Sequence, residues 1–390
     1  MRRKSYVCRP TGDITKYRVH GRTRYLSTLA FAGFITAASA ANITFSVTDL
    51  GTFPGALFGY ATDMNSQGAV VGTAFLQDSG AYHAYSQSGG VWTDLGTLGG
   101  KNSYATATNG AGTIVGSSDT DSGSRHAFNY QGGVMIDMGT LAGGNQSIAS
   151  AINSCGMIVG SSEIAGGATH AFSYSGGMMT DLGTVGGSYS EAYAINDVGI
   201  GTGYSSIAGD ARNHAVLFSN GVTIDLSGSP DALDSYGLGI NTAGDVVGEM
   251  NESNGDYHGF LYSGGTWTDL GTLGGSYSDA YSINTSGTVF GRAQIAGNAE
   301  FHAFMYSQGA MTDLNTLLDS TGIGWDLQSA QLTSSGQIIG YGYFNGNADS
   351  FLLVPSDVSA GNFSSSVPEP GSALMLVGGL GLIGTGRRRK

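Results

Sequence analysis

One segment of about 44 residues recurs along most of the chain. The copies align on an aspartate that is usually followed by Leu-Gly, and successive aspartates lie 45, 43, 44, 44, 44 and 44 residues apart. The aspartates are Asp49, Asp94, Asp137, Asp181, Asp225, Asp269 and Asp313. A histidine stands 11 residues before six of them: His83, His126, His170, His214, His258 and His302. A fixed period of this length predicts a repeat architecture, in which each unit buries its apolar face against the next.

Each repeat contains four short segments with the pattern of β-strands. From His170, polar and apolar residues alternate, and Gly176 and Gly177 supply a hairpin turn before the returning segment ending at Asp181. The next repeat has a buried segment that ends in an N-x-x-G turn at Asn196, followed by another apolar segment. Only 12% of residues are charged and 66 are glycine, which favours an all-β fold. The sequence predicts four antiparallel strands per repeat.

The repeats start and stop out of phase. Residues 42–51 supply only the last strand of a unit, whereas the unit that begins near Trp325 ends at Val354 without that strand. The two fragments complete each other, so we predict a seven-bladed β-propeller whose ring is closed by the N-terminal strand. An open β-solenoid of 22-residue coils is the alternative, but it explains neither the hairpin turns nor the divided unit.

The N-terminal 40 residues have the features of a secretory signal peptide. Eight basic residues precede an apolar run over about residues 26–36, and Ala38-Ser39-Ala40 has the small-x-small pattern of a cleavage site. A transmembrane anchor is the alternative, although the run is shorter than the about 20 residues that span a bilayer. Residues 41–386 contain 4 basic and 28 acidic residues, a net charge of −24, which disfavours nucleic acid as a partner.

The C-terminal end has three parts: a Ser-rich spacer over residues 356–366, a Pro-Glu-Pro motif, and an apolar run that ends in a basic cluster. A simple tail anchor is one interpretation. The segment 367–390 also resembles the PEP-CTERM sorting signal, which exosortases process in Gram-negative bacteria that make exopolysaccharide. The resemblance rests on Val367, Pro368, Glu369, Pro370, Arg387, Arg388 and Arg389. It implies an exosortase-type partner, a precursor held transiently in the inner membrane, and a mature protein at the cell surface or outside the cell.

The repeat region, residues 41–355, resembles the extracellular HAF repeats. These are named for His-Ala-Phe, as at His170, and typically continue into the pattern found at Asp269–Gly275. The triplet varies at His83, His214 and His258, and the seventh unit has no histidine. The resemblance implies secretion and a surface location, and it implies no defined activity.

The repeated histidines and aspartates are the first candidates for chemistry. Imidazole is a common metal ligand, and Asp–His pairs occur in hydrolases. Catalysis requires one asymmetric group of residues, whereas these recur once per blade around a ring. We therefore predict a structural hydrogen bond from each histidine to a carboxylate or a backbone group.

The connectors between the second and third strands supply the second set of candidates. Three arginines in alternate blades could together grip a carboxylate, as in sialidases, or could simply be solvated. The oxygen-rich runs 119–123 and 251–256 could hold calcium, or could be ordinary polar loops. The candidate binding residues are Asp119, Asp121, Arg125, Arg212, Glu252, Asp256 and Arg292.

These features together predict an exported, non-catalytic surface or matrix protein. We expect it to bind glycan, such as exopolysaccharide, or another envelope component through the face that carries the second-to-third connectors. No cofactor is expected apart from the calcium considered above. The alternative is a propeller enzyme of the glycosidase or lyase type that acts on extracellular polysaccharide.

Overall fold

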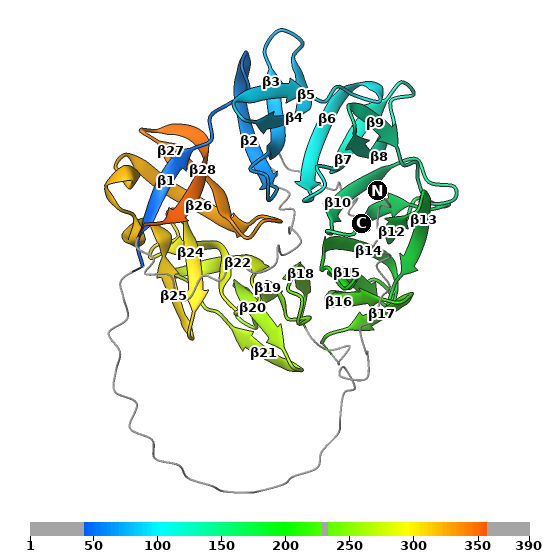
Figure 1. The fold of residues 1–390 in the computed structure, drawn as a ribbon. Coiled ribbons are helices and arrows are strands. Elements are labelled where there is room, and N and C mark those ends of the chain that lie inside the picture. Colours follow the sequence, from blue (N-terminus) through cyan, green and yellow to red (C-terminus); the bar gives the residue numbers. More distant parts are fainter. Residues whose placement is uncertain (1–42, 228–232, 357–390) are drawn as a thin grey trace, which may run out of the picture.

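The computed structural model describes residues 43–227 and 233–356, which form 28 strands arranged in a ring (Figure 1). The predicted signal peptide with Ala38 and Ala40, the predicted sorting tail and nearly all of the spacer lie outside these residues. Within the described ranges, no helix is long and apolar enough to cross a membrane.

The strands form seven antiparallel four-stranded blades, which confirms the predicted fold class. A single parallel bridge between Tyr257 and Tyr277 joins blades 5 and 6 into one eight-stranded sheet. Blade 1 contains β2 (Ala56–Met64), β3 (Val70–Leu76), β4 (Ala81–Ser88) and β5 (Val91–Asp94). Blade 2 contains β6 (Gly99–Thr108), β7 (Ile114–Thr120), β8 (Arg125–Gln131) and β9 (Val134–Asp137). Blade 3 contains β10 (Ser147–Ile152), β11 (Ile158–Glu163), β12 (Thr169–Ser175) and β13 (Met178–Gly183).

Blades 4 to 6 repeat this order. Blade 4 contains β14 (Gly186–Ile195), β15 (Gly201–Ile207), β16 (Asn213–Ser219) and β17 (Val222–Asp225). Blade 5 contains β18 (Ser235–Ile240), β19 (Val246–Asn251), β20 (Tyr257–Ser263) and β21 (Thr266–Asp269). Blade 6 contains β22 (Gly274–Ile283), β23 (Val289–Ile295), β24 (Phe301–Ser307) and β25 (Ala310–Asp313). The first strand of each blade lies nearest the axis of the ring (Figure 1).

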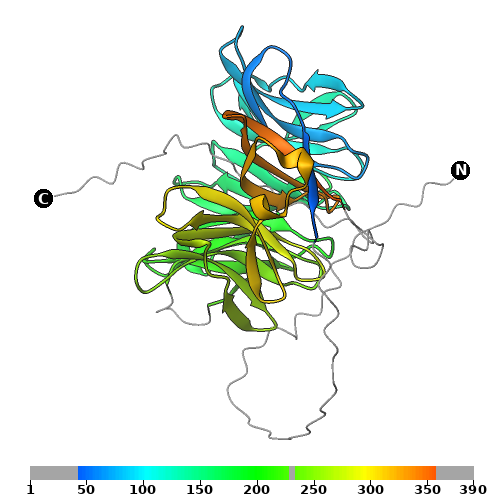
Figure 2. The same cartoon turned by 90° about the vertical axis from the view of Figure 1, so that its left-hand side faces the viewer.

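Blade 7 joins the two ends of the repeat region, as predicted. It contains β26 (Trp325–Leu332), β27 (Ile338–Phe344), β28 (Asn347–Pro355) and the N-terminal strand β1 (Phe45–Asp49), which pairs with β28. The blue β1 lies against the orange C-terminal strands in both views (Figures 1 and 2). Phe45 and Val47 of β1 are buried in the core of this blade, so the pairing removes both a free sheet edge and exposed apolar surface.

The second strand of every blade contains a glycine that the packing requires. A Cβ atom at any of these glycines would lie 1.8 to 2.1 Å from a backbone oxygen of the first strand. The first strand has a β-bulge beside this point, and a buried aromatic or branched residue of the third strand covers the glycine in each blade. The seven glycines are Gly72, Gly116, Gly160, Gly203, Gly248, Gly291 and Gly340.

Polar side chains connect each blade to the next. The hydroxyl of Ser103 accepts a hydrogen bond from the Ala84 N–H and donates one to the Gly96 carbonyl, both in the preceding repeat. Ser147, Ser190 and Ser278 repeat this arrangement. These bonds attach the segment after the repeat histidine, and the glycine that follows the Asp-Leu or Asp-Met pair, to the neighbouring blade.

The asparagines of the N-x-x-G turns form a second set of links that the sequence did not predict. Each side-chain oxygen closes its own turn, and in four of the six turns Nδ2 also donates to the carbonyl of the asparagine in the next blade. The links run from Asn109 to Asn153, Asn196, Asn241 and Asn284, at 2.9 to 3.2 Å. The turns therefore also hold neighbouring blades together.

Asp63 of β2 spans the closing junction of the ring. Its carboxylate accepts hydrogen bonds from the N–H groups of Met64, Thr108 in blade 2, and Ser334 in blade 7. Nearby, the amide of Gln331 donates to the Thr62 carbonyl at 2.6 Å. Blades 7, 1 and 2 are thus linked through one buried carboxylate.

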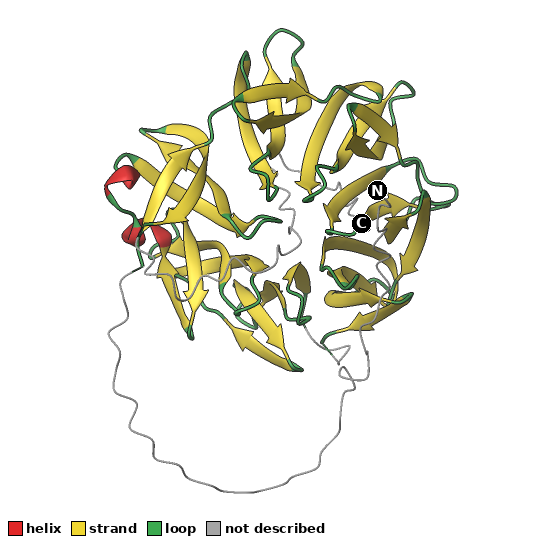
Figure 3. Cartoon of the chain, viewed as in Figure 1, coloured by secondary structure: helices red, strands yellow, loops and turns green. Residues whose placement is uncertain are grey.

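The connector between blades 6 and 7 covers the outer edge of β1. It contains the 3-10 segments η2 (Leu314–Leu317) and η3 (Ser320–Gly322), drawn red in Figure 3, which the sequence analysis did not predict. The Asp319 N–H bonds to the Phe45 carbonyl, and the Thr321 hydroxyl accepts from the Val47 N–H at 2.7 Å. The connector satisfies polar backbone groups that an outer strand would otherwise expose.

Candidate functional site

The antiparallel order of the strands divides the loops between two faces of the ring. The loops between second and third strands and the connectors between blades lie on one face, here called the connector face. The N-x-x-G and Gly-Gly hairpin turns lie on the opposite face, here called the turn face. All the candidate residues discussed below, except those of one cavity, lie toward the connector face.

Each of the six repeat histidines bonds to the aspartate 11 residues later. The distance from Nδ1 to the nearer carboxylate oxygen is 2.6 to 3.0 Å in all six pairs. The carboxylate also accepts the backbone N–H two residues further along, as Asp94 does from Gly96 at 2.8 Å. This geometry ties the end of the fourth strand to the third strand, and it supports the structural interpretation of the pairs.

Blade 7 replaces this pair with two carboxyl groups. Asp49 of β1 occupies the aspartate position, and Asp349 of β28 stands where the histidine would be. Burial, followed by the charge of Asp49, raises the pKa of Asp349 despite an opposing hydrogen bond from Ser350. The closing blade therefore has a local repulsion that the other six blades avoid.

The three candidate arginines do not form a common anion site. Arg125 binds Asp119 at 3.0 Å, Arg212 lies 3.8 Å from Asp234, and Arg292 binds Asp279 at 2.7 Å. Each guanidinium is thus neutralised by an aspartate of its own or the next blade. The arrangement gives no support to the sialidase-like interpretation.

Two of the predicted placements were wrong. Arg292 lies within β23 and Asp119 within β7, because the second strands extend further than the variable sequence suggested. Arg125 is the first residue of β8, and Arg212 lies in a connector as expected. The side chains of Asp119 and Arg292 therefore project from sheets rather than from loops.

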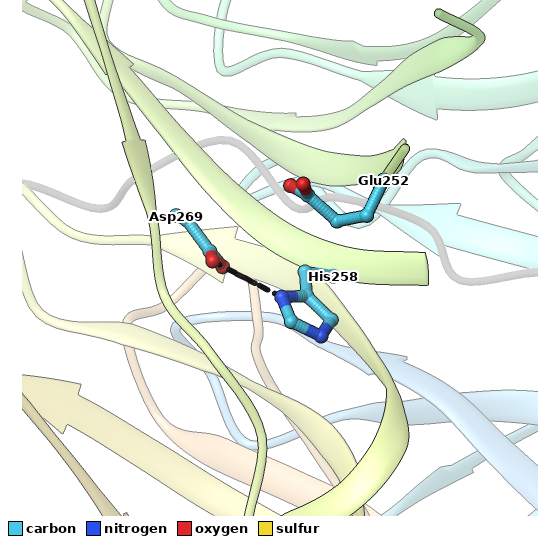
Figure 4. Close-up of side chains that lie close together, drawn as sticks. All are labelled: Glu252, His258 and Asp269. Carbon is cyan, nitrogen blue, oxygen red and sulfur yellow. Dashed lines mark hydrogen bonds and ion pairs between the residues drawn. The ribbon is translucent and has the colours of Figure 1, made fainter. Parts of the chain in front are cut away.

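The two runs considered for calcium do not gather oxygen ligands around one point. The Asp119 carboxylate is used by Arg125 and by the Asn102 amide, and Asp121 is exposed at the loop tip. In the second run Asp256 bonds to Asn254, whereas Glu252 lies beside His258 and Asp269. Figure 4 shows that Glu252 approaches the histidine–aspartate pair of its own blade.

A buried polar cluster at the junction of blades 5 and 6 was missed by the sequence analysis, apart from Arg292. Asp279 of β22 is 3% exposed, accepts from Arg292 Nε and bonds to the Tyr281 hydroxyl at 3.0 Å. The hydroxyl of Tyr277 donates to Glu249 of β19 at 2.6 Å. The Arg292 guanidinium lies 4.5 Å from the centre of the Phe301 ring. We call these six residues the blade 5–6 cluster.

Glu249 of the blade 5–6 cluster has a raised pKa. Burial, followed by the hydrogen bond to Asp279 and the charge of Asp279, raises the pKa of Glu249 to about 8. When protonated, the Glu249 carboxyl group can donate to Asp279, whose buried Oδ1 has no other partner among the described residues. The cluster thus combines two carboxyl groups, a guanidinium and aromatic rings.

A departure from the repeat could have revealed this cluster. Asp279 and Arg292 occupy positions that hold Tyr104 and Ser117 in blade 2, Ile148 and Ser161 in blade 3, and Glu191 and Tyr204 in blade 4, so the acid has a counterpart but the arginine has none in these blades. An ionisable residue at a position that the strand pattern predicts to be buried needs a partner. Aligning the repeats by position, rather than inspecting their variable loops, would have identified it.

A second aromatic group bridges blades 1 and 2. Phe58 stacks on Phe75 at 5.4 Å, Tyr82 stacks on Tyr104 at 5.5 Å, and Arg125 lies 4.7 Å above the Tyr104 ring. Phe58 is 44% exposed. This group presents apolar surface on the connector face.

A cavity of about 270 Å³ lies on the turn face, between blades 2 and 3. Its lining includes Asn109, Thr113, Gln131, Ile158 and Tyr174. The lining contains none of the residues predicted to bind ligand, all of which were expected on the other face.

Comparison with known proteins identifies the C-terminal end. Residues 366–390 match the PEP-CTERM protein-sorting motif. No curated protein matches the chain.

Solved structures with a similar fold have little sequence identity to the chain. A puromycin-hydrolyzing peptidase of Mycobacterium tuberculosis is 11% identical, with 80% of this chain and 55% of the peptidase covered and a TM-score of 0.49. The chain thus spans about half the length of that peptidase. The β-propeller domain of the Trilobed protease from Pyrococcus furiosus is 11% identical, with 67% and 97% covered and a TM-score of 0.36.

A mutant Aleuria aurantia lectin in complex with α-methyl-L-fucoside is also 11% identical, with 70% and 94% covered and a TM-score of 0.34. The fold itself is established by the seven blades described above. The chain is therefore a β-propeller protein with a C-terminal PEP-CTERM motif, which indicates an exported cell-surface protein sorted by an exosortase.

Proposed function

We propose that this protein binds an extracellular glycan through its connector face and is not a catalyst. The blade 5–6 cluster is the observation that carries the proposal. Its guanidinium, from Arg292, lies between carboxyl and aromatic groups where two blades join, whereas blade 4 has Tyr204 at the position of Arg292. A rigid scaffold with a local departure of this kind is typical of a binding site.

The chemistry of the cluster suits a polyhydroxylated ligand. Sugar hydroxyls accept hydrogen bonds, so they match the Arg292 guanidinium, whose side chain is 35% exposed, while the buried Asp279 holds it in place. Phe301 and Tyr277, both half-buried, offer ring surface to the apolar faces of a sugar. The net charge of −24 over residues 41–386 opposes binding of a polyanion, so we infer an uncharged polysaccharide.

One observation favours the enzymatic alternative. Protonated Glu249 beside Asp279 could act as a general acid near neutral pH. Glycosidases, however, need both carboxyl groups beside the scissile bond, whereas Asp279 is 3% exposed and is held by Arg292 and Tyr281. The pair is therefore better suited to recognition than to glycoside hydrolysis.

A polysaccharide array probed with the mature protein tests the proposal. We expect binding to uncharged bacterial polysaccharides, and we expect Phe301→Leu or Glu249→Gln to weaken it about tenfold or more. Phe58→Leu, in the aromatic group of blades 1 and 2, is the matched control on the same face. Unchanged binding by both cluster variants would contradict the assignment of the site.

A second measurement separates binding from catalysis. The bound polysaccharide is incubated with the protein, and new reducing ends are counted over time. Binding without release of ends supports the proposal. Release of ends that disappears in Glu249→Gln would replace it with the enzymatic alternative.

A further inference from the structure

Three side chains with metal-binding atoms meet on the connector face where blades 6 and 7 join. Glu300 ends the connector before β24, His302 follows in β24, and Asp326 lies near the start of β26. One ligand atom of each lies within 4.8 Å of the others. None of this depends on the blade 5–6 cluster or on glycan binding.

The hydrogen bond to Asp313 fixes which nitrogen of His302 is available. Nδ1 lies 2.6 Å from Asp313 Oδ2, and the other carboxylate oxygen of Asp313 accepts from Asn315. Nδ1 therefore donates to Asp313, which leaves Nε2 as the nitrogen that faces Asp326 and can bind a metal. A histidine held by a carboxylate at one nitrogen is the usual arrangement when the other nitrogen binds a metal.

The distance between His302 Nε2 and the Asp326 carboxylate fits two ligands of one ion better than it fits a hydrogen bond. Nε2 lies 3.7 Å from Asp326 Oδ1, which is too far for a hydrogen bond. Metal–ligand distances of about 2.0 to 2.2 Å place two ligands of one ion about 3 to 3.5 Å apart. A small movement of the half-exposed Asp326 side chain would complete the geometry.

Other junctions between blades have different residues at the positions of Glu300 and Asp326. The two positions that hold Glu300 and Asp326 hold Arg212 and Asp234 at the junction of blades 4 and 5, where they form an ion pair at 3.8 Å. At the junction of blades 2 and 3 the same positions hold the uncharged Ser124 and Gln146. Only between blades 6 and 7 do two carboxylates occupy them beside an imidazole edge, which places three groups able to bind one cation together.

We propose that Glu300, His302 Nε2 and Asp326 bind a divalent transition-metal ion such as Zn²⁺, with Asp313 as a positioning residue. The nitrogen ligand and the low number of protein oxygens favour Zn²⁺ over Ca²⁺. Three protein ligands leave coordination positions open to water or to a donor group of a bound molecule. The site would also clamp blade 6 to blade 7.

A second group of similar composition lacks this arrangement. In blade 5, Glu252 and Asp269 both lie on the Nδ1 side of His258, and Nε2 points away from Glu252 (Figure 4). Nδ1 is already bonded to Asp269 at 3.0 Å. A metal there would have to displace the proton that this blade, like five others, uses for its histidine–aspartate bond, so this group is the matched control.

Titration calorimetry of the metal-stripped mature protein with ZnCl₂ at pH 7.5 is the test. We expect one equivalent of Zn²⁺ to bind, and Glu300→Gln or Asp326→Asn to weaken binding at least tenfold. Glu252→Gln should bind as the parent does. Asp313→Asn, which keeps an acceptor for Nδ1 but loses its charge, should weaken Zn²⁺ binding about tenfold without lowering the melting temperature of the metal-free protein.

Substituting Co²⁺ for Zn²⁺ gives an independent readout. A visible absorption band from nitrogen-ligated Co²⁺ should appear in the parent and in Glu252→Gln, and should be lost in the double variant Glu300→Gln/Asp326→Asn. The proposal is wrong if the parent binds no Zn²⁺. It is also wrong if the double variant retains parental affinity, or if Glu252→Gln lowers affinity as much as the double variant does.

Discussion

Asp63 departs from the repeat, and its carboxylate links blades 7, 1 and 2. Other blades have Ala, Gly, Ser or Gln at this position of the first strand. Burial raises the pKa of Asp63 to about 7, because the three N–H donors that favour its charged form offset only part of the cost of burying a charge. Ser282, at the same position in blade 6, makes one such link: its hydroxyl accepts a hydrogen bond from the Leu332 N–H of blade 7 at 2.8 Å.

The raised pKa of Asp63 predicts a pH-dependent stability. Between about pH 4 and pH 7 the folded protein holds a proton that the unfolded chain releases, so stability falls as pH rises across this interval and levels off above it. Because the pKa of Asp63 rises from 3.8 to about 7 on folding, its protonation contributes roughly 4 kcal/mol at most to the free energy of unfolding. Urea unfolding of the parent and of Asp63→Ser from pH 4 to pH 8 checks this. The variant should lose most of the slope, and an equal slope in both would contradict the assignment.

At the scale of the strand, β1 is the element on which ring closure depends. It buries Phe45 and Val47, pairs along its whole length with β28, and is covered on its outer edge by the connector before blade 7. The sequence predicted the pairing because the first and last units were each incomplete. It did not predict the covering connector, whose 3-10 turns follow from Asp313 and Asp319 capping short segments rather than from any repeat.

Deleting residues 43–49 should open the ring. Loss of Phe45 and Val47 should cost several kcal/mol, at about 1.5 to 3 kcal/mol for each buried apolar side chain, and the freed edge of β28 should promote association. Melting temperature and light scattering measure the two effects. Ser46→Ala, which removes only a hydroxyl that bonds to the Val354 carbonyl, is the control. A deletion variant that melted with the parent and stayed monomeric would exclude closure by β1.

The N-x-x-G turn is the element whose role was only half predicted. The spacing indicated a turn closed by asparagine, but the bond from Nδ2 to the next blade joins groups about 44 residues apart and leaves no local pattern. The blade 5–6 cluster escaped prediction for the same reason. Glu249 and Asp279 lie in different repeats, and their contact depends on how two blades pack. The repeat period and the turn residues therefore predict the strands of a blade, whereas the contacts between blades depend on packing that the sequence pattern does not show.

Replacing Asn196 by Asp isolates the link between turns. The substitution keeps the oxygen that closes the turn at Ile200 and turns the donor facing the Asn241 carbonyl into an acceptor. Because Asn196 is fully buried, we expect a loss of about 1 to 3 kcal/mol. Asn284→Asp is the control, since Asn284 closes its turn without such a link to the described residues. Equal losses in the two variants, measured by urea unfolding, would show that the link contributes nothing.

At the scale of the whole molecule, the sorting motif predicts a processing event. Replacing Pro368 and Pro370 by Ala should leave a precursor that retains Arg387–Lys390, because the motif at residues 366–390 would no longer direct exosortase processing. Intact-mass measurement of membrane and secreted fractions compares the two forms. A Ser364→Ala variant, changed outside the matched motif, is the control. Normal maturation of the double proline variant would contradict this role.

The pairing of β1 with β28 has a consequence for how the protein is oriented. Phe45 is paired with Pro355, and the Ser356 N–H bonds to the Thr44 carbonyl, so the chain enters and leaves the ring at the same place on the turn face. The sorting motif follows from that point. For a protein tethered by its C-terminal end, we expect the turn face to lie toward the attachment. We expect the connector face, with the blade 5–6 cluster and the Glu300–His302–Asp326 group, to be directed away from the cell that exports it.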